Sequence, residues 1–333
     1  MLVLGIESSC DETSAAVIKD GREVLSNIIL SQKEHTKFGG VVPEVASRVH
    51  LKTVVPIYEE ALEAAKVTLD DIDLIAATMG PGLVGPLLVG LTFAKGLAFT
   101  KDIPFIGVNH MEGHLSANYL EHPDLNPHHI SLVVSGGHTM LMEVKSFGEY
   151  TMLGNTIDDA CGEAYDKVAK IMGLGYPGGA KLDKLAQKGK KDAIQFPRAL
   201  LKEDSYRFSY SGLKTAVSLY IQKLSESELK EQLNDIAASF QEAAIEVLVI
   251  KTLKAAEDKN LNHISLSGGV AANSRLRSMF EERIGDNQKL FYPSIKLCTD
   301  NAAMIAAAGY FRFQKDGAGS LNANAVPYLK LAK

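Results

Sequence analysis

The sequence predicts an α/β protein made of two lobes. Segments with strand-like patterns alternate with helical ones along most of the chain, which is typical of α/β folds. A strand, a small polar turn and a second strand follow one another twice, in residues 4–21 and again in residues 132–148. The length of 333 residues also suits two domains better than one.

The first half of the chain is expected to open with three strands, at residues 2–7, 14–19 and 22–30. A long helical pattern over 44–66 is expected to bend near Pro56, because proline lacks the amide hydrogen that continues a helix. The elements that follow are expected to be a strand at 73–79, a helix ending near Thr100 and a short buried strand at 105–108.

The second half is expected to begin with strands and to become mainly helical. The predicted elements are strands at 130–135 and 139–145, a helix at 158–173, a loop at 175–179, helices between 208 and 257, a strand at 264–269, a helix at 270–283 and a last helix from about 299. We therefore expect a first lobe of residues 1–128, completed by the C-terminal helix at about 305–333. Residues 129–304 are expected to form the second lobe, with binding loops and helical insertions.

The composition is that of an ordinary globular enzyme, with 46% hydrophobic and 23% charged residues. No apolar run reaches the roughly 18 residues of a membrane span, and the N-terminus becomes acidic too early for a signal peptide. Cys10, Cys161 and Cys298 are far apart and predict neither a zinc knuckle nor a disulfide framework. We therefore expect a cytoplasmic protein with no membrane partner.

Positive charge is concentrated in one segment, although the formal net charge of −5 argues against binding nucleic acid with the whole surface. Residues 181–214 contain nine Lys/Arg and four Asp/Glu, with Phe196, Tyr206, Phe208 and Tyr210 among them. Such a segment can follow phosphates while its aromatic rings stack on bases. The alternative is a solvated helix and loop whose aromatic side chains pack inward.

Two histidines four residues apart, His110 and His114, predict half of a metal site. On a helix, residues at this spacing lie on one face, so that both imidazoles reach one ion. The peptidase motif H-E-x-x-H requires a glutamate directly after the first histidine. That position is Met111, and Glu112 points roughly 200° away from His110 at the helical period. Histidines at this spacing are also common as ordinary surface or core residues.

Three turns with small residues predict one nucleotide cleft. The turns of the two repeated strand pairs can hold a polyphosphate between them, because backbone amides in such turns point at an anion. Gly136 and Gly137 let the backbone of the second turn approach a ligand closely. The third segment, residues 266–276, joins a strand to a helix whose first amides are free for a ligand. Each glycine pair taken alone is typical of a simple turn.

The chain resembles the TsaD family over essentially its whole length. The resemblance is carried by these motifs: "GIESSCDET", "GGVVPEVASRVH", "GPGLVGPLLVG", "NHMEGH", "VSGGHT", "GEAYDKVAK", "GYPGG", "FSYSGLKTA", "SLSGGVAANS" and "CTDNAAMIA". It implies the two-lobed fold of the actin-like, sugar-kinase and heat-shock-protein ATPase (ASKHA) superfamily, with a duplicated core and a central nucleotide cleft. It also implies a tRNA-modifying acyltransferase, which moves threonylcarbamoyl from threonylcarbamoyl-AMP to N6 of the adenosine 3′ of the anticodon in tRNAs reading ANN codons.

The resemblance implies specific site residues. The metal ligands fall on His110, His114 and Asp300, which would hold one divalent ion per subunit, Fe²⁺ in preference to Zn²⁺. Contacts to the adenine nucleotide, which is threonylcarbamoyl-AMP or ATP and ADP, fall on Val134, Ser135, Gly136, Gly137, His138, Asp166, Gly179, Asp183 and Asn273. Ser9, Cys10, Asp11 and Glu12 lie in or beside the first turn near the expected phosphate. The candidates for the proton acceptor are Asp11, which we prefer, and Glu12. Asp300 is equally suited to cap the last helix.

The resemblance further implies partners: tRNA, the paralogue TsaB, the ATPase TsaE and a TsaC-type synthase that supplies the adenylate. The helix at 44–66 is the expected surface for the paralogue, with burial in its own lobe as the alternative. Three other functions stay open at this point. They are a glycoprotease-like metallopeptidase, a small-molecule kinase of the same fold, for which carboxylates would be expected to bind Mg²⁺, and a catalytically silent partner subunit.

Overall fold

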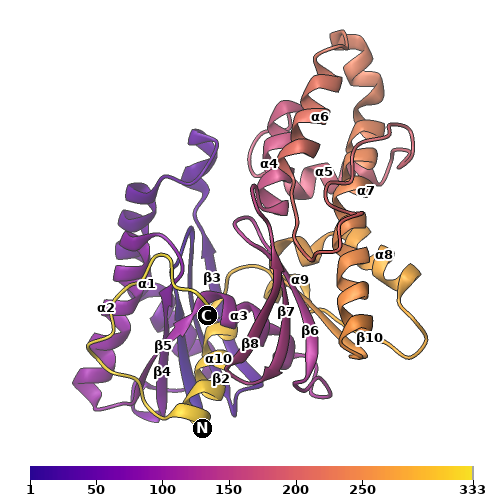
Figure 1. Ribbon diagram of the computed structural model, residues 1–333. Helices are drawn as coiled ribbons and strands as arrows, with labels where there is room; N and C mark the ends of the chain where they lie inside the picture. Colours follow the sequence, from indigo (N-terminus) through magenta and orange to yellow (C-terminus); the bar gives the residue numbers. More distant parts are fainter. Residues whose placement is uncertain (332–333) are drawn as a thin grey trace. The chain divides into compact units, whose positions relative to one another are not determined.

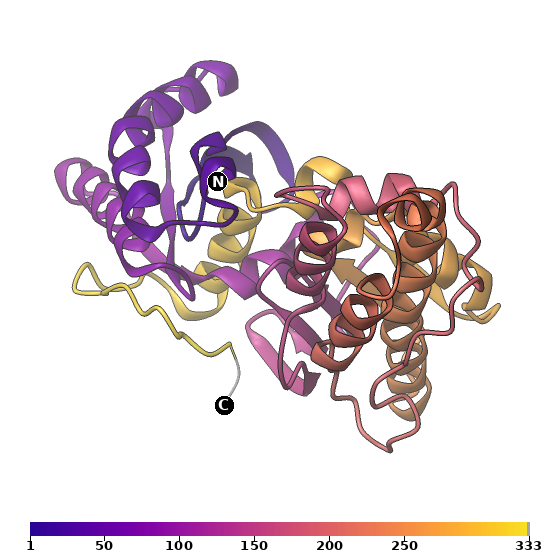
Figure 2. The same ribbon diagram turned by 90° about the horizontal axis from the view of Figure 1, so that it is seen from above.

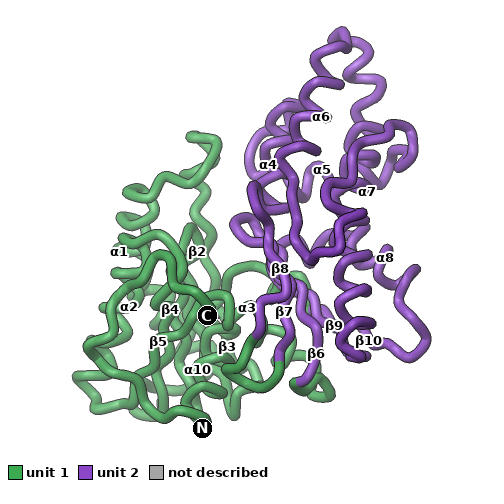
Figure 3. The backbone as a smooth tube through the Cα atoms, viewed as in Figure 1, with its two compact units in different colours: residues 1–127, 145–150, 293–333 green, residues 128–144, 151–292 purple. Residues whose placement is uncertain are grey.

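The computed structural model describes residues 1–331, which form two compact units. Unit 1 contains Met1–Pro127, Lys145–Tyr150 and the chain from Pro293 on, whereas unit 2 contains His128–Val144 and Thr151–Tyr292 (Figure 3). The chain therefore leaves unit 1 and returns to it, and the C-terminal helix belongs with the N-terminal sheet. The lobe boundaries expected from the sequence stay a prediction.

Unit 1 is built on a five-stranded sheet with the order β3-β2-β1-β4-β5 (Figure 1). Its strands are β1 (Leu2–Glu7), β2 (Glu12–Lys19), β3 (Glu23–Ser31), β4 (Leu74–Gly80) and β5 (Phe105–Asn109). The first three strands form an antiparallel meander, and β4 and β5 continue the sheet in parallel with β1. The parallel strands end at one edge of the sheet, so the segments that follow β4 and β5 start side by side.

Helices cover both faces of this sheet. The two helices α1 (Pro43–Ala65) and α2 (Val84–Lys101) pack on the face that carries Leu4 and Ile6, and α10 (Ala302–Asp316) packs on the other (Figures 1 and 2). The alternation of β1 explains this division, because successive side chains of a strand point to opposite faces. Gly5 faces α10, and a Cβ added there would lie 2.2 Å from the carbonyl oxygen of Ala302.

Unit 2 repeats the same sheet with the order β10-β9-β6-β7-β8. Its strands are β6 (His129–Val134), β7 (Thr139–Ser146), β8 (Glu149–Asn155), β9 (His263–Ser267) and β10 (Lys289–Phe291). Again a hairpin, β6 with β7, is followed by two strands parallel to its first member. The strand–turn–strand theme seen twice in the sequence therefore corresponds to a duplicated core.

Five α-helices of the described residues lie in unit 2. They are α4 (Cys161–Ile171), α5 (Gly179–Ala186), α6 (Ser211–Ile221), α7 (Glu226–Asp258) and α8 (Ser274–Arg283). Unit 1 adds two short helices, α3 (His110–Ser116) and α9 (Ile295–Cys298). Among residues 1–331, no helix combines the length and the apolar character that crossing a membrane requires.

The structure differs from the expected elements at several places. The strands β8 and β10 have no counterpart in the prediction. The helix expected at 270–283 is divided into a short 3-10 turn, Gly269–Ala272, and α8, because the side chain of Asn273 caps α8 by accepting the amide hydrogen of Leu276. The last helix begins at Ala302, after its cap Asn301.

Candidate metal centre and nucleotide-binding loops

The two histidines lie on α3, a short helix that starts where β5 ends. The side chain of Asn109 caps this helix by accepting a hydrogen bond from the amide of Met111 at 2.9 Å. All seven residues of α3 are buried. His110 and His114 lie one turn apart on the same face, with their ring centroids 4.8 Å apart. The spacing in the sequence therefore places both imidazoles together, inside unit 1.

Asp300 completes a group that can hold a metal ion. Its Oδ1 lies 3.4 Å from Nε2 of His110 and 3.2 Å from Nε2 of His114. One ligand atom from each of the three residues lies within 4.8 Å of the other two. Both ring nitrogens of His114 are buried, and neither has hydrogen-bond geometry to a described residue. The imidazole can therefore serve as a metal ligand. Two imidazole nitrogens and one carboxylate oxygen suit iron or zinc.

The three side chains interact strongly even without an ion. Burial alone would lower the pKa of His110, but the charges of Asp300 and Glu7 and their hydrogen bonds raise it well above its ordinary value. Burial would likewise raise the pKa of Asp300, and His110 and His114 hold it well below the usual range. A cation is therefore favoured at this position, whether it is a proton on His110 or a metal ion.

Asp300 does not cap the last helix. The side chain of Asn301 accepts the amide hydrogen of Met304 at 3.1 Å and is the cap of α10. The capping role considered for Asp300 was therefore wrong by one residue. The two neighbouring residues have different roles, since Asn301 caps the helix and Asp300 faces the histidines.

Glu112 faces away from the histidine pair. Its Oε1 accepts a hydrogen bond from the hydroxyl of Tyr150 at 2.9 Å and lies 3.9 Å from Nε of Arg312. Burial raises the pKa of this carboxyl, against the opposing effect of Arg312. The carboxylate therefore cannot activate a water held by His110 and His114, which a peptidase of the H-E-x-x-H type requires.

Glu7 is a site residue that the motif analysis missed. Its carboxylate is fully buried, and Oε2 lies 3.0 Å from Nδ1 of His110. Burial would raise the pKa of Glu7, but the nearby His110 lowers it below its ordinary value. A signal was present in the sequence, because a glutamate that ends the apolar strand "LVLGIE" has no obvious place in a core.

The first hairpin turn, residues 8–11, contacts two other segments of unit 1, α1 and the loop after β4. The amide of Leu83 donates to the carbonyl of Ser9 at 2.8 Å, and the buried ring of His50 donates to the carbonyl of Cys10 at 3.0 Å. A Cβ on Gly82 would lie 2.6 Å from the carbonyl oxygen of Ser9, so the loop after β4 packs directly on this turn.

Burial raises the pKa of two groups in this segment, the carboxyl of Glu12 and the thiol of Cys10. Burial raises the pKa of Glu12 to about 9, with further contributions from the charges of Asp300 and Asp11, so Glu12 carries a proton at neutral pH. Burial also raises the pKa of Cys10 far above that of a free thiol. A neutral thiol is a poor nucleophile, so covalent catalysis by Cys10 is not favoured.

The second hairpin turn, Ser135–His138, lies in unit 2. The amide of Ser135 donates to the carbonyl of His138 at 2.8 Å, and the hydroxyl of Ser135 accepts from the amide of His138 at 3.1 Å. A Cβ added to Gly136 or Gly137 would meet only open space, so the turn exposes its backbone to a ligand. Gly268, with φ +87°, packs against the carbonyl of Val134 and brings the third loop beside the second turn.

The other polar residues that are expected to contact the nucleotide form hydrogen bonds between segments of unit 2. Asp183 accepts hydrogen bonds from the hydroxyl of Ser274 at 2.8 Å and from the amide of Gln241 at 3.1 Å. Asn273 donates to the same Gln241 at 2.8 Å. Asp166 accepts the amide hydrogens of Gly178, at 2.8 Å, and of Gly179. Asp183 and Asn273 therefore belong to one hydrogen-bonded group with Gln241 and Ser274, and Asp166 holds the start of α5.

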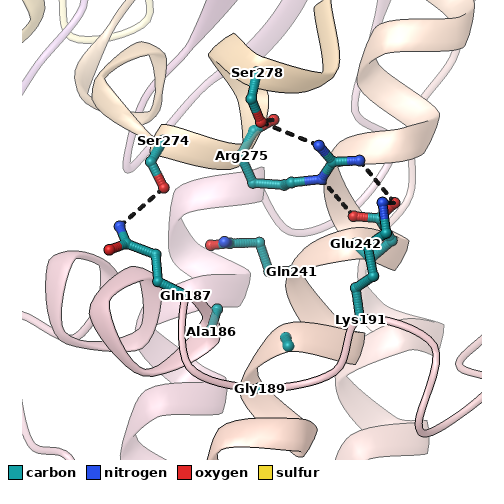
Figure 4. Close-up of a pocket in the computed structure, with 10 residues that line it drawn as sticks. Ala186, Gln187, Gly189, Lys191, Gln241, Glu242, Ser274, Arg275 and Ser278 are labelled. Carbon is teal, nitrogen blue, oxygen red and sulfur yellow. Dashed lines mark hydrogen bonds and ion pairs between the residues drawn. The ribbon is translucent and has the colours of Figure 1, made fainter. Parts of the chain in front are cut away.

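A cavity of about 240 Å³ borders this group (Figure 4). It is lined by α5, the turn after it, α7 and α8, and Gln241 and Ser274 belong to its wall. Figure 4 shows the guanidinium of Arg275 paired with Glu242, at 2.6 Å from Nε to Oε2. Lys191 approaches the same carboxylate at 3.8 Å.

The basic segment 181–214 is not an aromatic stacking surface. Phe196, Phe208 and Tyr210 are buried, and the hydroxyl of Tyr206 bonds to Asp258. Three of the four aromatic side chains therefore pack inward, as in the second of the two interpretations, and Tyr206 is half-buried. Lys188, Lys190 and Lys191 are exposed nonetheless. Gly189 between them is packed, since a Cβ there would lie 2.0 Å from the carbonyl oxygen of Asn234.

The expected site residues thus fall into two groups, one in each unit. Unit 1 holds the histidines, Asp300 and the turn with Ser9, Cys10, Asp11 and Glu12. Unit 2 holds Val134–His138, Asp166, Gly179, Asp183 and Asn273.

Comparison with known proteins identifies the family of this chain. A family model described as "TsaD: tRNA N6-adenosine threonylcarbamoyltransferase" matches residues 23–307. The chain belongs to the TsaD family. A relative named tRNA N6-adenosine threonylcarbamoyltransferase from Clostridioides difficile (strain 630) is 57% identical, with 99% of this chain and 98% of the relative covered. A relative of the same name from Clostridium beijerinckii is 54% identical over 100% of this chain and 98% of its own length.

Solved structures share the fold at low sequence identity. HypF from T. kodakarensis matches with a TM-score of 0.63 and 16% identity, over 94% of this chain and 47% of that one. The activator of 2-hydroxyisocaproyl-CoA dehydratase from Clostridium difficile matches with a TM-score of 0.55 and 12% identity, over 96% and 99% of the two chains. These likenesses concern the fold alone. This member of the TsaD family therefore has the duplicated α/β fold of the ASKHA superfamily.

The metal group generates a first prediction. The double variant His110→Ala, His114→Ala should lose bound metal, because only Asp300 of the three ligand side chains remains. Asp300→Ala should lose metal as well, and without the cost of a lost helix cap. Elemental analysis of the purified chains measures the metal content, and circular dichroism reports whether the fold survives.

A matched control comes from the neighbouring residue. Asn301→Ala removes the cap of α10 and should cost about 1 kcal/mol of stability, while the metal content stays that of the wild type. One metal ion per chain retained in the double histidine variant would show that the metal binds elsewhere.

Proposed function

We propose that this chain is a tRNA N6-adenosine threonylcarbamoyltransferase, which transfers threonylcarbamoyl from threonylcarbamoyl-AMP to N6 of the adenosine 3′ of the anticodon in tRNAs reading ANN codons. The observation that carries the proposal is the end-to-end similarity to relatives of that name, at 57% and 54% identity. The cluster of His110, His114 and Asp300 and the open glycine turn agree with such a reaction. The position of Glu112 disfavours the peptidase alternative.

The metal ligands in this proposal are His110, His114 and Asp300, and the ion is Fe²⁺ in preference to Zn²⁺. When bound, such an ion would act as a Lewis acid toward the carbamoyl carbonyl. The nitrogen and oxygen donors suit both ions, so the choice of iron rests on the family. Metal analysis of the chain purified without added metal, under exclusion of oxygen, distinguishes the two.

The adenylate is proposed to bind the loops of unit 2. In the turn Val134–His138, the exposed backbone of Gly136 and Gly137 would hold the phosphate, because anions bind where turn amides face them, and Val134, Ser135 and His138 would complete the contact. Gly179 and the side chains of Asp166, Asp183 and Asn273 would contact the nucleoside. Each of these three side chains already makes a hydrogen bond to a neighbouring segment of unit 2. Their orientation is therefore fixed before a ligand binds.

The nucleophile of this reaction is the exocyclic amine of adenine, whose lone pair is delocalised into the ring. The chain must therefore orient the amine against an activated carbonyl and take up one proton. We propose Asp11 as the acceptor, because its neighbour Glu12 already carries a proton at neutral pH. Ser9, Cys10 and Glu12 would then line the turn beside the leaving phosphate.

The decisive experiment is the transfer of labelled threonine to an unmodified tRNA transcript. The assay contains this chain, TsaB, TsaE, a TsaC-type synthase, bicarbonate, ATP and threonine. We expect label in tRNAs that read ANN codons and none in a transcript whose position 3′ of the anticodon is not adenosine. Equal labelling of both transcripts, or none in either, contradicts the proposed function.

The variant Gly137→Val tests whether the turn Ser135–His138 binds the nucleotide. The added side chain enters open space, so the fold should tolerate it, but it occupies the position where a phosphate would approach the backbone. We expect adenylate binding, measured by calorimetry with AMP, to fall at least about tenfold, which corresponds to about 1.4 kcal/mol. Unchanged AMP affinity would place the nucleotide elsewhere.

Binding of tRNA is proposed to use the exposed lysines of the basic segment. Changing Lys188, Lys190 and Lys191 to glutamate together should weaken binding to every tRNA about equally and flatten its dependence on salt, because contacts to phosphate carry no sequence information. Lys191 should contribute least, since Glu242 already lies near its amine. Fluorescence anisotropy at several salt concentrations, within the full complex, measures both effects.

A control with the same change of charge uses three exposed lysines outside the segment, Lys66, Lys223 and Lys230. Their replacement by glutamate should leave the salt slope near that of the wild type. If both triple variants behave alike, or if the first leaves affinity and slope unchanged, tRNA binds to another surface or to a partner.

The TsaB paralogue is proposed to bind the outer face of α1 and α2. We also propose that TsaE joins this complex and that the complex is cytoplasmic. Leu51 and Val55 on α1 and Val84 and Leu88 on α2 are exposed although they are apolar. The double variant Leu51→Asp, Leu88→Asp should weaken the complex with TsaB at least about tenfold in calorimetry. Leu219→Asp, an exposed apolar residue of α6 in unit 2, is the control. Equal affinity of the double variant and the wild type would exclude this face.

A further inference from the structure

The ring of His110 contacts two carboxylates through its two different nitrogens. Nε2 lies 3.4 Å from Oδ1 of Asp300, within the group of three possible ligands. Nδ1 lies 3.0 Å from Oε2 of Glu7, on the far side of the ring from that group. Glu7 is fully buried at the end of β1 and belongs to unit 1, as the histidines do.

Glu7 is surrounded by hydrogen-bond donors. The amide of Ser9 donates to Oε1, and the hydroxyl of Thr78 donates to Oε2. Ser9 also places its hydroxyl 3.2 Å from Nδ1 of His110. A carboxylate is costly to bury unless its oxygens are satisfied, and these donors satisfy both oxygens. The core around Glu7 therefore stabilises its negative charge.

We infer that Glu7 is a positioning residue, which accepts the hydrogen of Nδ1 of His110 and thereby leaves Nε2 free to bind a divalent cation. The inference rests on the metal centre of the proposed function. A neutral imidazole carries its hydrogen on one nitrogen only, and the hydrogen bond made by that nitrogen decides which nitrogen faces the metal. By bonding Ser9 as well, Glu7 couples the orientation of His110 to the turn that contains Asp11.

A glutamine could not replace this carboxylate. The carboxylate accepts from three groups, namely the amide of Ser9, the hydroxyl of Thr78 and Nδ1 of His110. A glutamine of the same shape offers one oxygen and one NH₂ group. If its oxygen faces Ser9, its NH₂ group faces Nδ1, which must then accept a hydrogen bond. His110 would carry its hydrogen on Nε2, where it blocks the cation.

The affinity for Zn²⁺ tests this inference. Competition with a chromophoric chelator should show Zn²⁺ binding 10- to 100-fold weaker in Glu7→Gln than in the wild-type chain, the range expected for the loss of such a partner. Glu112→Gln is the matched control, because Glu112 is also buried in unit 1 and lies two residues from each histidine but bonds to Tyr150. Its affinity should stay within about twofold of the wild type.

Nitrogen-15 NMR of the wild-type chain, labelled at histidine and loaded with Zn²⁺, provides a readout that no merely structural role of Glu7 would produce. His110, assigned by its loss in His110→Ala, should show a protonated Nδ1 and a metal-bound Nε2. Metal bound through Nδ1 would overturn the inference, and so would unchanged Zn²⁺ affinity in a folded Glu7→Gln. Because the wild type is used, this measurement decides even if Glu7→Gln does not fold.

These results are independent of the transferase reaction. If the chain binds Zn²⁺ as described but transfers no threonylcarbamoyl group, the proposed function fails and the role of Glu7 stands. If Glu7→Gln binds Zn²⁺ normally while the wild type transfers the group, the proposed function stands and the role of Glu7 fails.

Discussion

The close packing of α10 on β1 determines where Asp300 lies. Gly5 leaves no room for a side chain, because a Cβ there would lie 2.2 Å from the carbonyl of Ala302. The buried start of α10 is mainly alanine, so the helix can approach the sheet closely. Asn301 caps the helix, and Asp300 directly precedes the cap. The carboxylate is thereby held beside two histidines that lie about 190 residues earlier in the chain.

The duplicated core shows how one framework supports two different turns. In each unit, a glycine after the fourth strand of the repeat packs against the end of the hairpin, Gly82 against Ser9 and Gly268 against Val134. The framework is the same, but the chemistry differs. The turn of unit 1 contains Asp11 and is followed by Glu12, whereas the turn of unit 2 presents an open backbone. An acidic turn suits a cation and an open turn suits an anion.

The fold class could be predicted from the sequence because it depends on local pattern. The strand at 2–7 was expected with its observed bounds, and the duplicated hairpins were visible as a repeated theme. The edge strands β8 and β10 could not be predicted, because β8 is largely half-exposed and β10 has three residues, so neither carries a clear pattern.

The site could be predicted only in part. The spacing of His110 and His114 requires nothing but a helix, whereas the contact with Asp300 depends on the tertiary packing of α10 and came from the family motif. No spacing rule points to Glu7, since its relation to His110 depends on the order of strands in the sheet. The orientation of the aromatic residues in the basic segment could not be predicted either, because composition does not decide whether a ring faces a base or the core.

The chemistry of a histidine pair is decided by the groups that surround its ring nitrogens, not by the spacing of the pair. In the peptidase motif the assisting carboxylate is part of the same helix. Here the carboxylate of that helix, Glu112, bonds to Tyr150, and the carboxylates at the rings come from the end of β1 and from the residue before the cap of α10. The sheet and α10 of unit 1 therefore supply the carboxylates that the histidine helix does not. A centre built in this way depends on the packing of unit 1 as a whole.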